Sequence, residues 1–201
     1  MKIALLNGSV GGGLGNSAQV LEVFAQKLCG LQANLKLTVI TLSDHPSEKV
    51  LEMIHGVDAL VFATGTYWDS WGSPLQSFLE ASTETEGTEL WLGVPVSVLV
   101  TAHSVGAKGV LSRLQGVLNT YGCLIPPMSG WVYTSANQSA LQSSDSAQGN
   151  FTVDLWGPDD LDIVAQNLIV AARSRLSFKS WSVDRKGFRD VWIDLPGSQR
   201  E

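Results

Sequence analysis

The sequence predicts an α/β protein in which one doubly wound, five-stranded parallel sheet lies between two layers of helices, a three-layer sandwich. Apolar runs of strand length alternate along the chain with segments of helical periodicity, the order expected of repeated strand–helix units. Three of these runs, residues 2–7, 58–64 and 94–101, are nearly continuous in Val, Ile, Leu and Ala. That pattern is typical of parallel strands buried on both faces. With 44% hydrophobic residues among 201, the chain has enough apolar material for one sizeable core.

The elements are expected in strict alternation. Strands are predicted at residues 2–7, 35–42, 58–64 and 94–101, with a less regular one within 124–134. Helices are predicted at residues 17–30, 47–55, 73–81 and 106–121, and from 158 to about 176. The helix at 73–81 opens on Ser73-Pro74-Leu75-Gln76, which has the pattern of a capping box with proline at the first helical position. Right-handed crossovers between these units give the doubly wound sheet.

One domain is expected at residues 1–176, followed by a tail at 177–201. Residues 135–150 are rich in Ser, Gln, Ala and Asn, which predicts a mobile surface loop. The tail carries four aromatic residues and is expected to form a hairpin around residues 184–187. Those aromatic residues are Phe178, Trp181, Phe188 and Trp192.

Composition and charge exclude several classes of function. The formal net charge is −6 and the sequence pI about 5.0, which is unlike the basic surface of a nucleic-acid binder. No apolar run approaches the roughly 20 residues of a membrane span, and the first apolar run is too short for a signal peptide. A cytoplasmic protein is expected. Cys29 and Cys123 have no metal-ligand spacing, nor do the histidines, so both cysteines are expected to be buried free thiols.

The first candidate loop, residues 8–17, is rich in glycine and leads from a strand into a helix. Glycines let backbone amides converge on an anion, and the helix dipole favours negative charge at that point. Ser9, Asn16 and Ser17 add side-chain donors. The dinucleotide and Walker fingerprints are both absent, so a phosphate monoester is the predicted ligand. The alternative is a glycine-rich turn in which Ser17 is an ordinary helix cap.

Two further loops follow neighbouring strands and therefore reach the same edge of the sheet. Residues 64–72 place Tyr67, Trp68 and Trp71 within five residues, a cluster that favours contact with a flat ring such as a flavin. The alternative is that these rings cover the core or a subunit contact. Residues 101–109 are small and polar and enter a helix, so their amides and His103 could meet the polar edge of such a ring. The alternative is that His103 is an exposed histidine without a role.

Together these loops resemble the NAD(P)H-dependent FMN reductase family of the flavodoxin-like superfamily, over residues 2–133. The family's Gly-Ser-x-Arg and Gly-Asn-Ser/Thr are matched by Gly8-Ser9 and Gly15-Asn16-Ser17. Its Thr-Pro-x-Tyr-Asn is matched by Thr64-Gly65-Thr66-Tyr67-Trp68, and its Ser-Gly-Gly-x-x-Gly by Ser104-Val105-Gly106-Ala107-Lys108-Gly109. The chain departs from the family at Gly11, Gly65 and Val105, and Val105 is expected to crowd the flavin edge.

The resemblance implies a flavodoxin-like strand order of 2-1-3-4-5 and an FMN cofactor reduced by transient NAD(P)H through hydride transfer to flavin N5. It implies a small-molecule electron acceptor, such as a quinone, free flavin, azo or nitro compound, and a homodimer or homotetramer in which the tail makes contacts. No protein acid–base pair and no metal ligand are expected. The candidate cofactor-binding residues are Ser9, Gly15, Asn16, Ser17, Thr66, Tyr67, Trp68, Asp69, His103, Ser104 and Gly106.

Two other functions stay open on the sequence. The first is an electron carrier of the flavodoxin type, although such carriers are usually more acidic than this chain. The second is a binding or regulatory protein that kept the fold and lost the flavin, which the departures at Gly11, Gly65 and Val105 motivate.

Overall fold

The computed structural model describes residues 1–143, 156–174 and 176–183. Its sheet contains five parallel strands in the order β2-β1-β3-β4-β5, which confirms the predicted fold class and strand order. The strands are β1 (Lys2–Asn7), β2 (Lys36–Thr41), β3 (Ala59–Gly65), β4 (Val96–Ala102) and β5 (Gly130–Thr134). The strand order reverses between β1 and β3, so the loops after these strands diverge to opposite faces and leave a crevice at the carboxyl edge.

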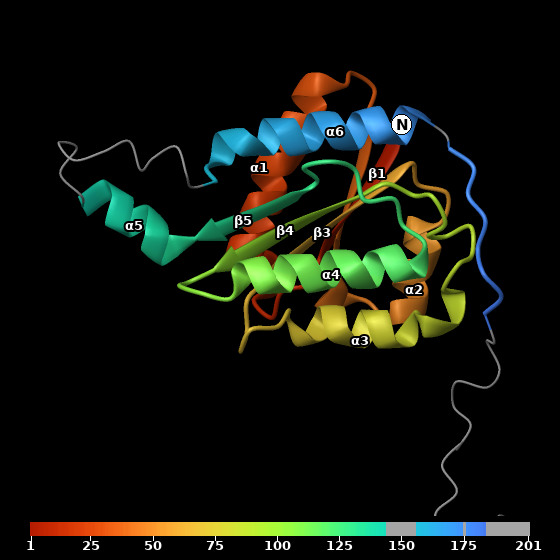
Figure 1. Ribbon diagram of the computed structural model, residues 1–201, viewed down its shortest axis with the longest axis horizontal. Helices are drawn as coiled ribbons and strands as arrows, with labels where there is room; N and C mark the ends of the chain where they lie inside the picture. The colour runs from red at the N-terminus through yellow and green to blue at the C-terminus, as the bar shows by residue number, and fades with distance from the viewer. Residues whose placement is uncertain (144–155, 175, 184–201) are drawn as a thin grey trace, which may run out of the picture.

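Helices cover both faces of the sheet. They are α1 (Asn16–Leu31), α2 (Ser47–Ile54), α3 (Ser73–Ala81), α4 (Ala107–Tyr121), α5 (Ser135–Ser143) and α6 (Leu161–Ser174). Figure 1 shows α1 and α6 on one face and α3 and α4 on the other, with α5 projecting beyond the carboxyl end of β5. Within the described residues, no helix is both long and apolar enough to cross a membrane.

Two local expectations are wrong. The helix at 73–81 forms, but its N-cap is Gly72 without a side-chain cap hydrogen bond, so the capping box is not made. Gln76 instead accepts a hydrogen bond from Trp71 Nε1 at 2.7 Å and donates one to Glu80 at 2.7 Å. Residues 135–143 are helical rather than a loop, because that stretch contains neither Gly nor Pro; residues 144–150 lie outside the described part.

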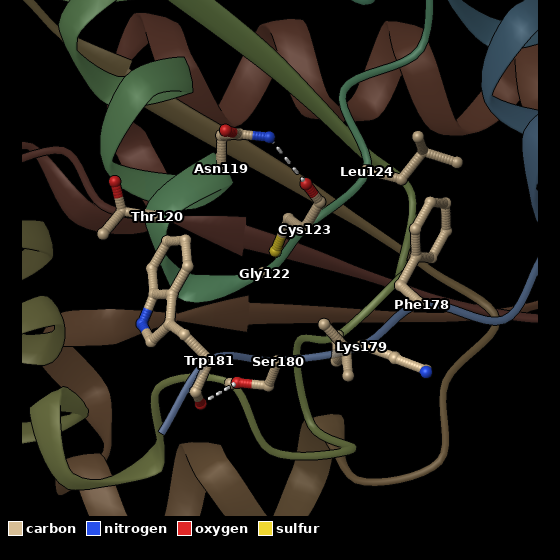
Figure 2. A pocket seen from close by; sticks show the side chains of 11 residues that line it. Asn119, Thr120, Gly122, Cys123, Leu124, Phe178, Lys179, Ser180 and Trp181 are labelled. Carbon is tan, nitrogen blue, oxygen red and sulfur yellow. Dashed lines mark hydrogen bonds between the residues drawn. The ribbon is translucent and has the colours of Figure 1, made fainter. Parts of the chain in front are cut away.

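The described part of the tail packs back on its own domain, at the amino edge of the sheet. Figure 2 shows Phe178 beside Leu124 and Trp181 beside Thr120, at the end of α4. Trp181 Nε1 donates to Glu86 Oε1 at 3.0 Å, and these contacts border a pocket of about 250 Å³. The expected hairpin, with Phe188 and Trp192, lies outside the described residues.

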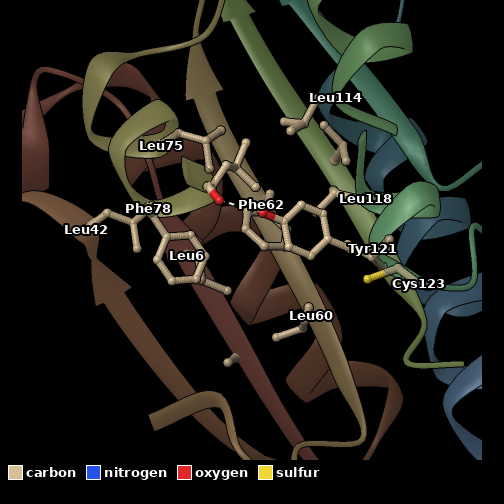
Figure 3. Close-up of a cluster of buried hydrophobic side chains, with 14 of the residues drawn as sticks. Leu6, Leu42, Leu60, Phe62, Leu75, Phe78, Leu114, Leu118, Tyr121 and Cys123 are labelled. Carbon is tan, nitrogen blue, oxygen red and sulfur yellow. Dashed lines mark hydrogen bonds between the residues drawn. The ribbon is translucent and has the colours of Figure 1, made fainter. Parts of the chain in front are cut away.

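The core has two halves because alternate residues of each buried strand face opposite helix layers. Figure 3 shows the half under α3 and α4, where Leu6, Leu60 and Phe62 of the strands meet Phe78 and Leu118 of the helices. On the other face, Leu5 and Val61 lie in the half under α1 and α6. β1, β3 and β4 are buried along almost their whole length, as their continuous apolar sequences predicted.

The two cysteines differ in exposure. Cys123 is 2% exposed, and burial raises the pKa of its thiol, whereas Cys29 is exposed near the end of α1, so the prediction that both are buried is wrong for Cys29. Cys29 falls on the outer face of an amphipathic helix, whose inner stripe includes Phe24 and Leu28.

We expect a neutral thiol reagent to modify one thiol in the native protein and two after denaturation. The native reaction is expected to disappear in Cys29→Ser and to persist in Cys123→Ser, because reagent access follows exposure and the thiolate fraction. Rapid modification of both thiols in the folded protein would contradict the burial of Cys123.

Candidate functional site

The three candidate loops meet at the carboxyl edge of the sheet, beyond the strand ends of β1, β3 and β4. Each of these strands ends in a buried polar side chain that ties down a loop: Asn7 on β1, Thr64 on β3 and Thr101 on β4. Thr64 Oγ1 accepts a hydrogen bond from the Gly72 amide at 3.0 Å, and the hydroxyls of Thr101 and Ser17 lie 3.2 Å apart. Buried polar groups need partners, so these bonds fix the loops relative to the sheet.

The first loop wraps around the side chain of Asn7. Asn7 Nδ2 donates to the Gly12 carbonyl at 2.7 Å, while its Oδ1 accepts the Ser9 amide at 3.2 Å and the Ser9 hydroxyl at 2.9 Å. A short 3-10 turn, Gly12–Leu14, then leads to Gly15, the N-cap of α1. The first amides of α1, those of Asn16 and Ser17, have no acceptor within the helix.

The second loop is a tight hairpin. Tyr67 and Ser70 exchange two backbone hydrogen bonds of 2.8 Å, and the two residues between them, Trp68 and Asp69, have φ of 47° and 56°. Two consecutive residues at positive φ make a turn of the type that follows the twist of paired strands. Trp68 is thereby placed in solvent with a relative exposure of 102%, and the ring of Tyr67 folds back over Gly65, where a Cβ would lie 3.0 Å from Tyr67 Cε2.

The third loop turns into α4 at Gly106, which has a φ of 89°. A Cβ on Gly106 would come within 2.1 Å of Asp69 Oδ1 and 3.3 Å of Thr66 Cγ2, so the second loop packs directly on this glycine. Val105 is 77% exposed and lines a neighbouring pocket together with Ser104 and Gly106, outside the wall of the central pocket.

A pocket of about 130 Å³ lies where the loops converge. Seven of the predicted residues line it: Ser9, Gly15, Asn16, Ser17, Thr66, Tyr67 and His103. Ser104 and Gly106 line a neighbouring, more open pocket of about 530 Å³ instead, and Trp68 and Asp69 form the hairpin tip. Hence the structure gathers most, but not all, of the predicted set around one hollow.

The sequence reasoning missed several residues that shape this pocket. Gly65, Thr101 and Ala102 also line it, and Asn7 and Gly72 hold its loops. The sequence did contain a signal for Asn7 and Thr101, since each is a polar residue at or next to the end of an otherwise apolar buried strand. Such a residue faces the loop that follows the strand.

Among the described residues, those that form the wall of the pocket carry hydrogen-bond donors and no carboxylate. Hydroxyl, carboxamide and imidazole groups line it together with the amino end of α1, whose dipole favours an anion. Thr66 Oγ1 is buried and has no hydrogen-bond partner among the described residues. Such a group costs free energy unless a ligand or water satisfies it.

A family model described as NADPH-dependent FMN reductase matches residues 1–138. The chain belongs to the NADPH-dependent FMN reductase family. It is an FMN-dependent oxidoreductase with NAD(P)H as co-substrate, and the three loops described above all fall within the matched residues.

Solved structures similar to this FMN reductase family member share its fold at low identity. An oxidoreductase from Corynebacterium diphtheriae is 15% identical, with a TM-score of 0.64 over 88% of this chain and 99% of that chain. RosB with a bound 8-demethyl-8-formylriboflavin-5'-phosphate is 14% identical, with a TM-score of 0.67 over 100% and 99%. An NADH:FMN oxidoreductase in its apo form is 14% identical, with a TM-score of 0.62 over 88% and 91%. No curated protein sequence matches the chain.

Proposed function

We propose that the protein reduces small aromatic electron acceptors with NAD(P)H, and that FMN binds with its phosphate in the first loop and its ring against the second and third. The pocket at the convergence of the three loops carries this proposal, because it combines the amino end of a helix with donor side chains and an unpartnered buried hydroxyl. That combination fits a phosphate monoester joined to a polar, flat ring.

At the phosphate end, Gly15, Asn16 and Ser17 would hold the anion, and Ser9 would shape the wall beside it, because both of its donors bond to Asn7 Oδ1. Gly15 is extended, with φ −86° and ψ 170°, and the first residues of α1, Asn16 and Ser17, line the pocket. Gly11 stands where the family has arginine, and a Cβ there would lie 3.2 Å from Gly15 Cα, so a larger side chain would require the loop to shift. Neutral donors and the helix dipole therefore replace a cation in this phosphate site.

At the ring end, the size of the pocket sets the arrangement. A volume of about 130 Å³ is below the roughly 300 Å³ at which sites for organic ligands begin, so it accepts the phosphate and part of the ribityl chain. The ring would then lie above the rim, where Thr66, Tyr67 and Trp68 meet one side of it. His103, Ser104 and Gly106 would meet the polar pyrimidine edge, where the amino end of α4 also points.

When bound, FMN supplies the redox chemistry, taking two electrons from NAD(P)H and passing them to the acceptor. The protein's part is binding and orientation. The tethered loops fix the phosphate, and the Thr66 hydroxyl would satisfy a polar ring atom. The amides at the start of α4 favour negative charge at the pyrimidine edge. The exposed Trp68 gives a flat acceptor such as a quinone, azo or nitro compound a surface to stack on.

The first experiment is to mix the protein with excess FMN, remove free ligand by gel filtration and record the visible spectrum. Retained flavin absorbance is expected, followed by NAD(P)H oxidation that depends on quinone, azo or nitro acceptors. A colourless protein would refute the site assignment.

Because no Lys or Arg is among the described residues lining the pocket, we also expect the FMN dissociation constant to change by less than about threefold between low and moderate salt in mildly alkaline buffer.

We further propose that a second copy of the chain covers the open side of the site. The three loops that meet at the pocket carry four strongly exposed apolar side chains: Val10 (55%), Leu14 (97%), Trp68 (102%) and Val105 (77%). An apolar rim of this kind is typical of a contact surface. A homodimer or homotetramer in light-scattering measurements, weakened by Leu14→Ser, would support the proposal.

A further inference from the structure

Asn7 occupies a position that no family motif and no composition argument singles out. It is the last residue of β1, is 1% exposed, and pairs in register with Thr41 of β2 and Ala63 of β3. Its carboxamide makes three hydrogen bonds, and all three go to the loop that follows rather than to the sheet. The buried carboxamide of Asn7 therefore holds the conformation of the following loop and makes no side-chain hydrogen bond to the described strands of the sheet.

The three bonds join the two ends of the segment that must curve around an anion. The amide nitrogen of Asn7 holds the Gly12 carbonyl, and the amide oxygen holds both donors of Ser9. The Gly12 amide in turn donates to the Ser9 carbonyl at 3.2 Å, which closes residues 9–12 into a turn. Gly12 has a φ of 55°, a conformation that the turn requires and that Asn7 holds through the carbonyl of the same residue.

We propose that Asn7 is a positioning residue that holds residues 9–12 in the conformation that receives the FMN phosphate, and that it thereby sets the preference for FMN over riboflavin. The inference rests on the proposed function, because it assumes that the phosphate binds in this loop. Both halves of the carboxamide are needed, since the donor orients Gly12 and the acceptor orients Ser9. A side chain of similar volume that lacks the donor or the acceptor would leave the pocket in place but would shift residues 9–12 at its phosphate end.

The test compares the dissociation constants of FMN and riboflavin, measured by flavin fluorescence, in wild type and in Asn7→Leu. Leucine is similar in size to asparagine and uncharged, but neither donates nor accepts. We expect FMN to bind about 10- to 100-fold more weakly and riboflavin to change by less than about twofold, so that the selectivity ratio collapses. Ser97→Ala is the matched control, because it also removes a buried polar group, from the distant part of β4, and should leave the ratio unchanged.

Asn7→Asp keeps the size of the side chain and its acceptor, and its comparison with the uncharged Asn7→Leu separates the shape of the loop from the charge near the phosphate. An ionised aspartate accepts from Ser9 but cannot donate to Gly12, whereas a protonated one does both, as the carboxamide does. The ratio is therefore expected to be low in alkaline buffer and to recover as the new carboxyl is protonated, while Asn7→Leu stays low at every pH. Asp44 on η2 (Leu42–Asp44), His45, Asp69 and His103 lie on the surrounding loops in all the proteins, so each ratio is referred to wild type at the same pH.

The possible outcomes are distinct. Selective loss of FMN in Asn7→Leu, with recovery of Asn7→Asp at low pH, supports the role of Asn7. An unchanged selectivity ratio in Asn7→Leu overturns that role, even if Asn7→Asp loses FMN, because the added charge alone would then explain the loss. Equal weakening of FMN and riboflavin binding in Asn7→Leu also overturns it. If Asn7→Leu does not fold, Asn7→Ala takes its place, because it also removes both halves of the carboxamide without adding a charge; a selective loss of FMN supports the role of Asn7 and an unchanged ratio overturns it. A wild-type protein that binds both flavins equally would refute the phosphate site itself, a different failure from that of Asn7.

Discussion

Alanine at Gly72 is expected to weaken FMN binding by about 100-fold or more and to lower the free energy of unfolding by about 1–3 kcal/mol. Gly72 is buried where the second loop crosses the first, and its amide is held by Thr64. A Cβ there would lie 2.4 Å from the Gly8 carbonyl oxygen and 3.1 Å from the Val10 nitrogen. Both are backbone atoms of the phosphate loop, so the clash can be relieved only by moving that loop. Flavin retention and urea denaturation measure the two effects.

Gly116→Ala is the control for this substitution. Gly116 lies within α4, and a Cβ there would meet nothing within 4 Å. Since alanine is favoured over glycine inside a helix, the variant should be more stable by about 0.5–1 kcal/mol and should bind FMN as wild type does. If Gly72→Ala retained FMN with wild-type affinity, the close packing of the two loops would have no part in forming the site.

The fold was readable from the sequence because its central strands are buried on both faces. In β1, β3 and β4, burial from the helix layers on both sides demands continuous apolar residues, and no other element of this length has that requirement. The edge strand β5 was harder. β5 is only Gly130–Thr134, because Pro126 and Pro127 lie in the segment before it and Met128 has a positive φ of 52°.

Local side-chain choices were less predictable than the elements that contain them. Ser73 and Gln76 have the spacing of a capping box, yet Gln76 bonds to Trp71 and Glu80. The competing donor, Trp71 Nε1, belongs to the preceding loop, and its position depends on tertiary packing. Spacing along a helix therefore indicated where α3 begins but not which hydrogen bonds its first turn makes.

The candidate site was predictable as three loops, and less so as individual contacts. Glycines and donors in the first loop directly indicate an anion site, whereas the hairpin at Trp68 and Asp69 has only a weak sequence signal, since Asp tolerates positive φ but Trp does not. The part played by Asn7 was also hidden, because it depends on how the loop folds back over the strand end. Contacts made by a buried polar residue at a strand end emerge only once the following loop is placed.

Thr66→Val is expected to change stability and flavin binding in opposite directions. Thr66 Oγ1 is buried without a partner among the described residues, so in the flavin-free protein its removal should stabilise the fold by about 1 kcal/mol. If the same hydroxyl satisfies a polar atom of the ring, the valine variant should bind FMN about tenfold more weakly. Thermal unfolding without flavin and a fluorescence titration with flavin give the two values separately.

Ser97 provides the comparison that makes this result specific. Its Oγ is also buried and unpartnered within the described residues, but it lies in β4, away from the pocket. Ser97→Ala should therefore gain stability without any change in FMN affinity. If Thr66→Val bound FMN as tightly as wild type, the Thr66 hydroxyl would make no contact with the ring. If Thr66→Val were less stable than wild type, the hydroxyl would already be satisfied in the flavin-free protein. The expected pattern is a gain in stability with a loss of FMN affinity in Thr66→Val, and a gain in stability alone in Ser97→Ala. That pattern would mean that the site carries an unsatisfied hydroxyl whose free-energy cost is offset only when flavin binds.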